Sequence, residues 1–99
     1  MPPPRMNDTE PFQRARAVAL RFLSYRPRSE AEVRSRLRRS FPPHTADQVI
    51  DDLKERGLLD DAMFARLWRD SRESLRPRSA WAIKRELIAR GVDDGLAAE

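Results

Sequence analysis

Clustered arginines are the residues of this sequence best suited to a chemical role, because a guanidinium pairs with a phosphate or carboxylate through two parallel hydrogen bonds. Four arginines fall between positions 34 and 39, and four more belong to two copies of a short motif. Arg34 and Arg38 lie one helical turn apart and should point the same way. We predict that this basic surface contacts DNA phosphates or an acidic protein surface. The candidates are Arg34, Arg36, Arg38, Arg39, Arg26, Arg28, Arg76, Arg78, Lys84 and Arg85.

Both groups of arginines also have a structural interpretation. Those at positions 34–39 can form an ordinary solvated helix exterior. The four that flank the repeated turn, Arg26, Arg28, Arg76 and Arg78, can instead tie that turn to the carbonyl groups at a helix end. For these four the structural role is the favoured one.

Other kinds of chemistry have little support in the sequence. The only histidine, His44, stands in a proline-rich loop without a second imidazole, and the chain has no cysteine. The pairs Asp51-Asp52 and Asp60-Asp61 could suggest a hard-cation site. Adjacent helix positions diverge by about 100°, however, and helix capping explains the second pair. We therefore predict no metal site, no cofactor, no small-molecule substrate and no enzymatic activity.

The composition favours a protein with an anionic partner. The 99 residues include 20 Lys and Arg against 16 Asp and Glu, which gives a formal net charge of +4. No apolar run approaches the roughly 20 residues of a membrane span. The start, Met1-Pro2-Pro3-Pro4-Arg5, lacks the apolar core of a signal peptide. We expect a cytoplasmic protein that makes no contact with a membrane.

A repeated motif organises the elements that must position these side chains. Arg26-Pro27-Arg28-Ser29 recurs as Arg76-Pro77-Arg78-Ser79. Such self-similarity indicates a duplicated helical unit. The apolar residues that follow the two copies correspond as well: Val33 with Ile83, and Leu37 with Leu87.

Proline, glycine and capping residues divide the chain into helices. Pro27 ends the first helix, because the residue before a proline is pushed out of the α region. Ser29-Glu30-Ala31-Glu32 forms a capping box that opens the second. Further caps are predicted at Asp8 or Thr9, Thr45, Asp60 or Asp61, and Ser79, with Gly57 and Gly91 following helix ends.

The predicted fold class is all-α, because the long segments have helical spacing and β-branched residues are sparse. Residues 1–8 are expected to be a disordered tail and residues 9–59 a first three-helix repeat. Residues 60–99 would form a second, incomplete repeat, since the four residues 96–99 are too few for a stable sixth helix in isolation. Trp68 and Trp81 are both predicted to lie in the core rather than on a contact surface. Trp81 stands at the edge of its helix's apolar face, however, so partial exposure and a partner contact stay open for it.

Four segments occur in an order that is informative even though each alone is a weak signal. They are Ala19-Leu20-Arg21-Phe22-Leu23-Ser24-Tyr25-Arg26-Pro27-Arg28-Ser29-Glu30-Ala31-Glu32-Val33, Leu53-Lys54-Glu55-Arg56-Gly57-Leu58-Leu59-Asp60-Asp61, Phe64-Ala65-Arg66 and Arg85-Glu86-Leu87-Ile88-Ala89-Arg90-Gly91-Val92. With these segments, roughly residues 12–96 resemble the RecX family of regulatory proteins.

The resemblance implies tandem three-helix repeats similar to helix-turn-helix units. It also implies a partner, the RecA recombinase or its filament on single-stranded DNA, and a non-enzymatic regulator that modulates, usually by inhibition, recombination and DNA repair. Such proteins usually carry three repeats, whereas here the second is predicted to be incomplete and the third absent. A chain of this length is not expected to span the same stretch of filament groove.

An alternative function is that of a helix-turn-helix-like protein that binds duplex DNA directly. The third helix of a unit would then enter the major groove and read bases with its early residues. Here that helix contains Asp47 and Asp51-Asp52, which phosphates would repel. This argues against base readout, while non-specific DNA contact stays open.

Overall fold

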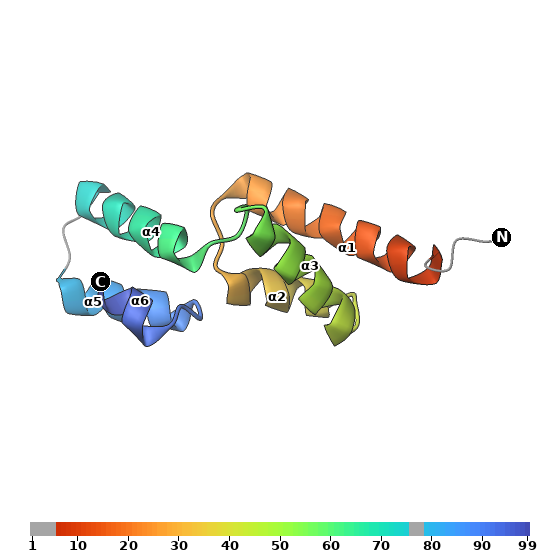
Figure 1. Cartoon of the computed structure of the whole chain (residues 1–99). Helices are drawn as coiled ribbons and strands as arrows, with labels where there is room; N and C mark the ends of the chain where they lie inside the picture. The colour runs from red at the N-terminus through yellow and green to blue at the C-terminus, as the bar shows by residue number, and fades with distance from the viewer. Residues whose placement is uncertain (1–5, 76–78) are drawn as a thin grey trace.

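The computed structural model describes the backbone of residues 6–75 and 79–99, and the side chains of residues 10–72 and 79–99. Within these residues the fold is all-α, as predicted, with no strand. Figure 1 shows the helices gathered into two groups that are placed end to end, and the molecule is elongated, with extents of 59 × 23 × 22 Å. The helices are α1 (Met6–Tyr25), α2 (Glu30–Arg38), α3 (Pro43–Glu55), α4 (Asp61–Leu75), α5 (Ala80–Ala89) and α6 (Asp94–Ala98).

The first unit, α1–α3, encloses a hydrophobic core of its own. Small residues of α1 let the other two helices approach closely, and branched residues of α2 and α3 fill the space between them. Partly buried aromatic residues, among them Phe22 and Phe41, pack around this core. Its buried members are Ala15, Ala19, Val33, Leu37, Ala46, Val49, Ile50, Leu53 and Leu59.

The second unit, α4–α6, has a separate core, against which Trp68 packs. Ile83 and Leu87 are buried there at the positions that Val33 and Leu37 occupy in the first unit, so the correspondence predicted from the repeat is confirmed. Each unit is therefore stabilised mainly from within. The buried residues of this core are Phe64, Ala65, Ile83, Leu87, Val92 and Ala97.

Most of the predicted helix boundaries are confirmed. The Ser29 hydroxyl accepts a hydrogen bond from the Glu32 amide at 3.1 Å, and the Glu32 carboxylate accepts one from the Ser29 amide at 3.0 Å, so the capping box is complete. Ser79 caps α5 and Asp60 caps α4 through their side chains. Gly57 follows α3 with φ +73°, as a left-handed helix end requires.

The starts of α1 and α3 and the existence of α6 differ from the predictions. Helix α1 begins at Met6, ahead of the caps predicted at Asp8 or Thr9; residues 1–5 of the expected tail lie outside the described residues. Helix α3 begins at Pro43 rather than after Thr45, because proline needs no amide donor at a first helical position. Helix α6 forms because burial of Ala97 in the second core adds the tertiary packing that an isolated segment lacks.

The prediction for the two tryptophans was right for one and wrong for the other. Trp68 is partly buried against Phe64, with ring centroids 5.9 Å apart. Trp81 is 66% exposed on the outer face of α5. Helical spacing identifies the side of a helix that is apolar, but it does not show how wide the buried strip is. Among the described helices, none has both the length and the apolar character needed to cross a bilayer.

Candidate anion-binding cleft between the two units

The two units meet at the start of α2, in a contact that we call the inter-unit joint. The Ser29 hydroxyl donates a hydrogen bond of 2.5 Å to the carbonyl oxygen of Arg90, the residue that ends α5. The Glu30 amide donates one of 2.8 Å to Oδ1 of Asp61, the first residue of α4. Both bonds satisfy groups at helix termini that have no partner within their own helix.

Close packing of backbone completes this joint. Gly91 has φ +84°, and a Cβ atom at this position would overlap with the Cβ of Ala31 in α2. Only glycine allows both the left-handed conformation and this approach. The second unit is thus seated directly on the first turn of α2.

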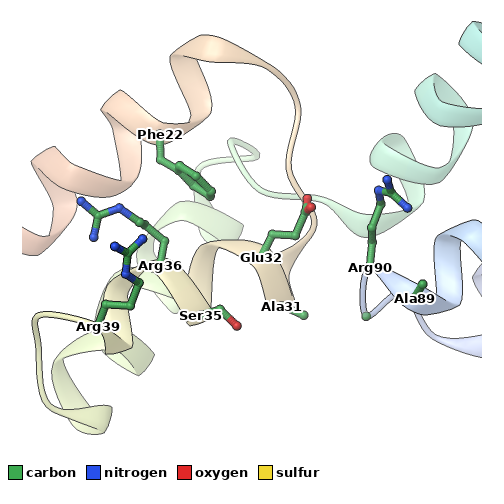
Figure 2. Close-up of a pocket in the computed structure, with 9 residues that line it drawn as sticks. Phe22, Ala31, Glu32, Ser35, Arg36, Arg39, Ala89 and Arg90 are labelled. Atoms are coloured by element: carbon green, nitrogen blue, oxygen red, sulfur yellow. The ribbon is translucent and has the colours of Figure 1, made fainter.

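An open cleft of about 450 Å³, the inter-unit cleft, lies beside the joint. Figure 2 shows Phe22, Arg36 and Arg39 gathered on the side formed by α1 and α2, while Ala89 and Arg90 reach the cleft from α5. Its lining residues are Phe22, Ala31, Glu32, Ser35, Arg36, Arg39, Ala89, Arg90 and Gly91. The cleft therefore draws on two consecutive helices, α1 and α2, and on the end of α5, which is far from both in the sequence.

Arg36 and Arg39 supply the available positive charge of the cleft. Neither forms an ion pair with any residue whose side chain the structure describes. The single carboxylate of the cleft, Glu32, is already paired with Arg26 at 3.1 Å. Two unpaired guanidinium groups beside a neutralised carboxylate suit a phosphate or carboxylate ligand.

Arg90 lines the cleft but its guanidinium is engaged elsewhere. It lies over the Trp68 ring, with its Cζ 3.9 Å from the centroid, and donates to the Glu86 carbonyl at 3.1 Å. The Trp68 indole and Arg72 both donate to the Glu86 carboxylate, at 2.9 and 3.0 Å. Arg90 thus holds the end of α5 in position while its backbone joins the two units.

The remaining arginines of α2 differ in availability. Arg34 donates to the Glu30 carboxylate at 3.0 Å and to Asp47 at 3.4 Å, and the hydrogen bond that it donates to Glu30 raises the pKa of this guanidinium. Arg38 is exposed and, among the described side chains, has no ion-pair partner. The predicted pair Arg34 and Arg38 therefore consists of one engaged and one available cation.

Arg26 and Arg28 make the contacts expected of the structural interpretation. Arg26 donates to the Pro27 carbonyl at 2.7 Å as well as to Glu32. Arg28 lies over the Phe22 ring, 3.8 Å from its centroid, and donates to the Phe22 carbonyl near the end of α1. Burial is the main cause that lowers the pKa of Arg28.

The other predicted site residues belong to the second unit. Lys84 and Arg85 lie on α5, away from the cleft, and Arg85 stacks on the exposed Trp81 with its Cζ 4.9 Å from the ring centroid. Arg76 and Arg78 lie outside the described residues. Among the residues that the structure describes, no group of His, Cys, Asp and Glu could hold a metal ion.

Sequence reasoning did not identify Phe22 and Arg90 as part of the site. Phe22 follows the apolar spacing of α1 and was counted only as a core residue. Arg90 stands just before a helix-ending glycine, where a basic residue is common, so no local signal distinguishes it. Only the placement of α5 against α2 brings both residues to one cleft.

These features define an all-helical protein of tandem three-helix repeats, joined end to end beside a basic cleft. The family model of the first three-helix domain of RecX matches residues 15–53, and that of the second matches residues 60–99. The chain belongs to the RecX family.

Curated relatives agree with this assignment. The regulatory protein RecX of Mycobacterium ulcerans is 41% identical over 96 residues, which cover 96% of this chain and 56% of the relative. That of Mycobacterium tuberculosis is 40% identical over 96% of this chain and 54% of its own length. The regulatory protein RecX of Amycolatopsis mediterranei is 36% identical over 100% of this chain and 57% of its own length. The chain thus spans slightly more than half the length of these relatives. No solved structure matches it.

Proposed function

We propose that this protein is a non-enzymatic, cytoplasmic regulator that binds the RecA recombinase, or its filament on single-stranded DNA, and inhibits recombination and repair activity. Family membership supports a regulatory role. The observation that carries the binding proposal is the pair Arg36 and Arg39, two arginines that line one cleft without an ion-pair partner among the described side chains. A RecA–DNA filament presents phosphates and carboxylates that such a pair can bind.

Direct reading of duplex DNA has less support. In a helix-turn-helix protein the third helix enters the major groove. The exposed residues of α3 include Asp47, Asp51 and Glu55, so phosphates would be repelled by this helix. The arginines that are available at the cleft, Arg36 and Arg39, lie on α2 and at its C-terminal cap instead. Sequence-specific binding of duplex DNA without any effect on RecA would contradict the proposal.

The DNA-dependent ATPase activity of RecA tests the proposal with the 99-residue chain itself. We expect inhibition that weakens as salt rises, because counterion release contributes to binding. Replacing Arg36 and Arg39 together by glutamate should raise the inhibitory concentration roughly tenfold or more and flatten the salt dependence.

Arg14 and Arg66 provide the matched control for this experiment. Both are exposed, lie on α1 and α4, and do not line the cleft. Their joint replacement by glutamate changes the net charge equally but should leave most of the inhibition. Equal effects of the two double variants would show that net charge, rather than the cleft, governs binding. No inhibition by the unaltered chain would reject the proposed function.

A further inference from the structure

The outer face of α5 combines an exposed tryptophan with positive charge. Trp81, Arg85 and Ile88 follow one another at helical spacing and share a side of the helix, with Lys84 at its edge. Trp81 is 66% exposed and Ile88 40% exposed. The Arg85 guanidinium lies over the Trp81 ring, with its Cζ 4.9 Å from the centroid.

The exposure of Trp81 calls for a physical reason. Aromatic rings this large contribute most to stability when they are buried, and a ring left in solvent gives up that contribution. Trp68 shows the usual arrangement, because it packs on the second core and its indole donates to Glu86. Among the described contacts, Trp81 neither packs on a core nor donates a hydrogen bond from its indole. Its environment is suited to a ligand rather than to the interior of this unit.

We infer that the outer face of α5 binds single-stranded nucleic acid by stacking an unpaired base on Trp81. Aromatic side chains next to cationic groups are the usual means of holding single strands, since bases offer flat faces and the backbone offers phosphates. In a duplex those faces are already covered by neighbouring bases. An apolar protein segment would leave Lys84 and Arg85 without anionic partners.

The same helix leads to the inter-unit cleft. Ala89, eight residues beyond Trp81 on α5, lines the cleft that also holds Arg36 and Arg39. At about 1.5 Å per residue, the two positions are roughly 12 Å apart along the helix. A strand stacked on Trp81 can therefore place its backbone near Arg85 and continue toward the arginines of α2. The inference rests on the proposed function in that it identifies the nucleic-acid contact within it.

The test measures binding of a fluorescently labelled oligothymidylate of about 16 nucleotides to the full chain, without RecA, by anisotropy. Trp81→Leu keeps an apolar side chain but removes the aromatic face, whereas Trp81→Phe keeps one. We expect the leucine variant to bind at least fivefold more weakly and the phenylalanine variant to stay within about threefold of the unaltered chain. Duplex DNA of equal length should compete poorly.

Met63→Ala is the matched control, since Met63 is 45% exposed and lies on a different helix, α4. It should bind the oligonucleotide like the unaltered chain. Because Trp81 is exposed, its variants should keep their helical circular dichroism and melting temperature. Unchanged affinity of Trp81→Leu would overturn the inference. Equal losses for leucine and phenylalanine would do so as well, because they would indicate a contact other than stacking.

The outcome can be separated from that of the proposed function. Oligonucleotide binding that depends on Trp81, without any inhibition of RecA, would support the stacking site and reject the regulatory proposal. Inhibition of RecA that Trp81→Leu leaves unchanged, together with oligonucleotide binding equally unchanged, would retain the regulatory proposal and reject the stacking site.

Discussion

The hydroxyl of Ser29 donates a 2.5 Å hydrogen bond to the carbonyl oxygen of Arg90, a residue 61 positions later in the chain. The Ser29 hydroxyl oxygen also accepts a hydrogen bond from the Glu32 amide, and in this way it caps the N-terminus of α2. One fully buried side chain therefore begins a helix of the first unit and satisfies the end of a helix of the second. Loss of the Ser29 Oγ atom alone would therefore remove both the cap of α2 and a hydrogen bond between the two units.

Ser29→Ala should lower the free energy of unfolding by about 2–3 kcal/mol, because it removes a cap and leaves the part-buried Arg90 carbonyl without its partner. Ser79→Ala is the matched control, since Ser79 caps α5 but is exposed and bridges no units. It should cost about 1 kcal/mol. Urea unfolding followed by circular dichroism measures both. Equal losses would mean that the Arg90 bond adds nothing to stability.

Gly91→Ala should destabilise the protein more than Gly57→Ala. Both glycines have positive φ, so alanine costs about 1–2 kcal/mol at either position. At Gly91 the new methyl group also meets Ala31, which should add about 1–3 kcal/mol, whereas nothing lies near Gly57.

Ala31→Gly should partly restore the stability of the Gly91→Ala variant, because it removes the Ala31 Cβ atom that the new methyl group would overlap. In a double-mutant cycle the two substitutions together should cost less than the sum of their separate effects. Strict additivity in thermal unfolding would show that the second unit does not pack on α2 as described.

Acid should weaken the first unit through Glu30. Hydrogen bonding to Arg34, followed by Lys54, holds the pKa of Glu30 below its ordinary value. The folded state therefore binds the proton less readily than the unfolded chain, so this contribution is present above about pH 4.3 and is lost as the pH falls through the folded pKa. Glu30→Gln should show a shallower acid loss of unfolding free energy. An unchanged slope would contradict the assignment.

Asp61, which lies across the joint from Glu30, should make the free energy of unfolding depend on pH in the opposite direction. Burial is the main cause that raises the pKa of its carboxyl. The folded state holds this proton more tightly, so the contribution is present below about pH 3.9 and is lost as the pH rises through the folded pKa. Asp61→Asn should remove this decline from unfolding curves recorded across that range. If the free energy of unfolding of Asp61→Asn changed with pH just as that of the unaltered chain does, the contribution of Asp61 would be ruled out.

Glu32→Gln should strengthen binding of an anionic partner in the cleft. Glutamine can keep the capping box, so α2 should stay intact, while the cleft loses its one carboxylate and Arg26 loses its ion pair. We expect the inhibitory concentration in the RecA assay to fall roughly two- to fivefold, as for a partly exposed charge pair. Glu55→Gln, an exposed change on α3, is the control. Weaker inhibition by Glu32→Gln would argue against an anion in the cleft.

Local features of the fold could be predicted from the sequence. The capping box at Ser29 and the left-handed turn at Gly57 depend on residues within a few positions of one another, and both are confirmed. The burial of Ile83 and Leu87 followed from their correspondence with the first unit. Such features need no knowledge of how the helices are arranged.

The cleft could not be predicted in the same way, because it depends on how two units pack. Periodicity grouped Arg34 with Arg38, yet ion pairs with Glu30 and Asp47 engage the first of these. Arg36 and Arg39 gain importance only from the neighbouring end of α5. The spacing of α5 places Trp81 at the edge of an apolar strip and favours burial, but the buried part of that strip does not reach this residue.

Two separate cores also determine how this elongated molecule can bend. Each unit is held by its own buried side chains, whereas the joint depends on two hydrogen bonds and one glycine contact. We therefore expect bending to be easiest at the joint, where a change of angle would alter the width of the cleft between α2 and α5. A ligand that bridges Arg39 and the end of α5 would fix that angle, and so set the curvature of the whole rod, without disturbing either core.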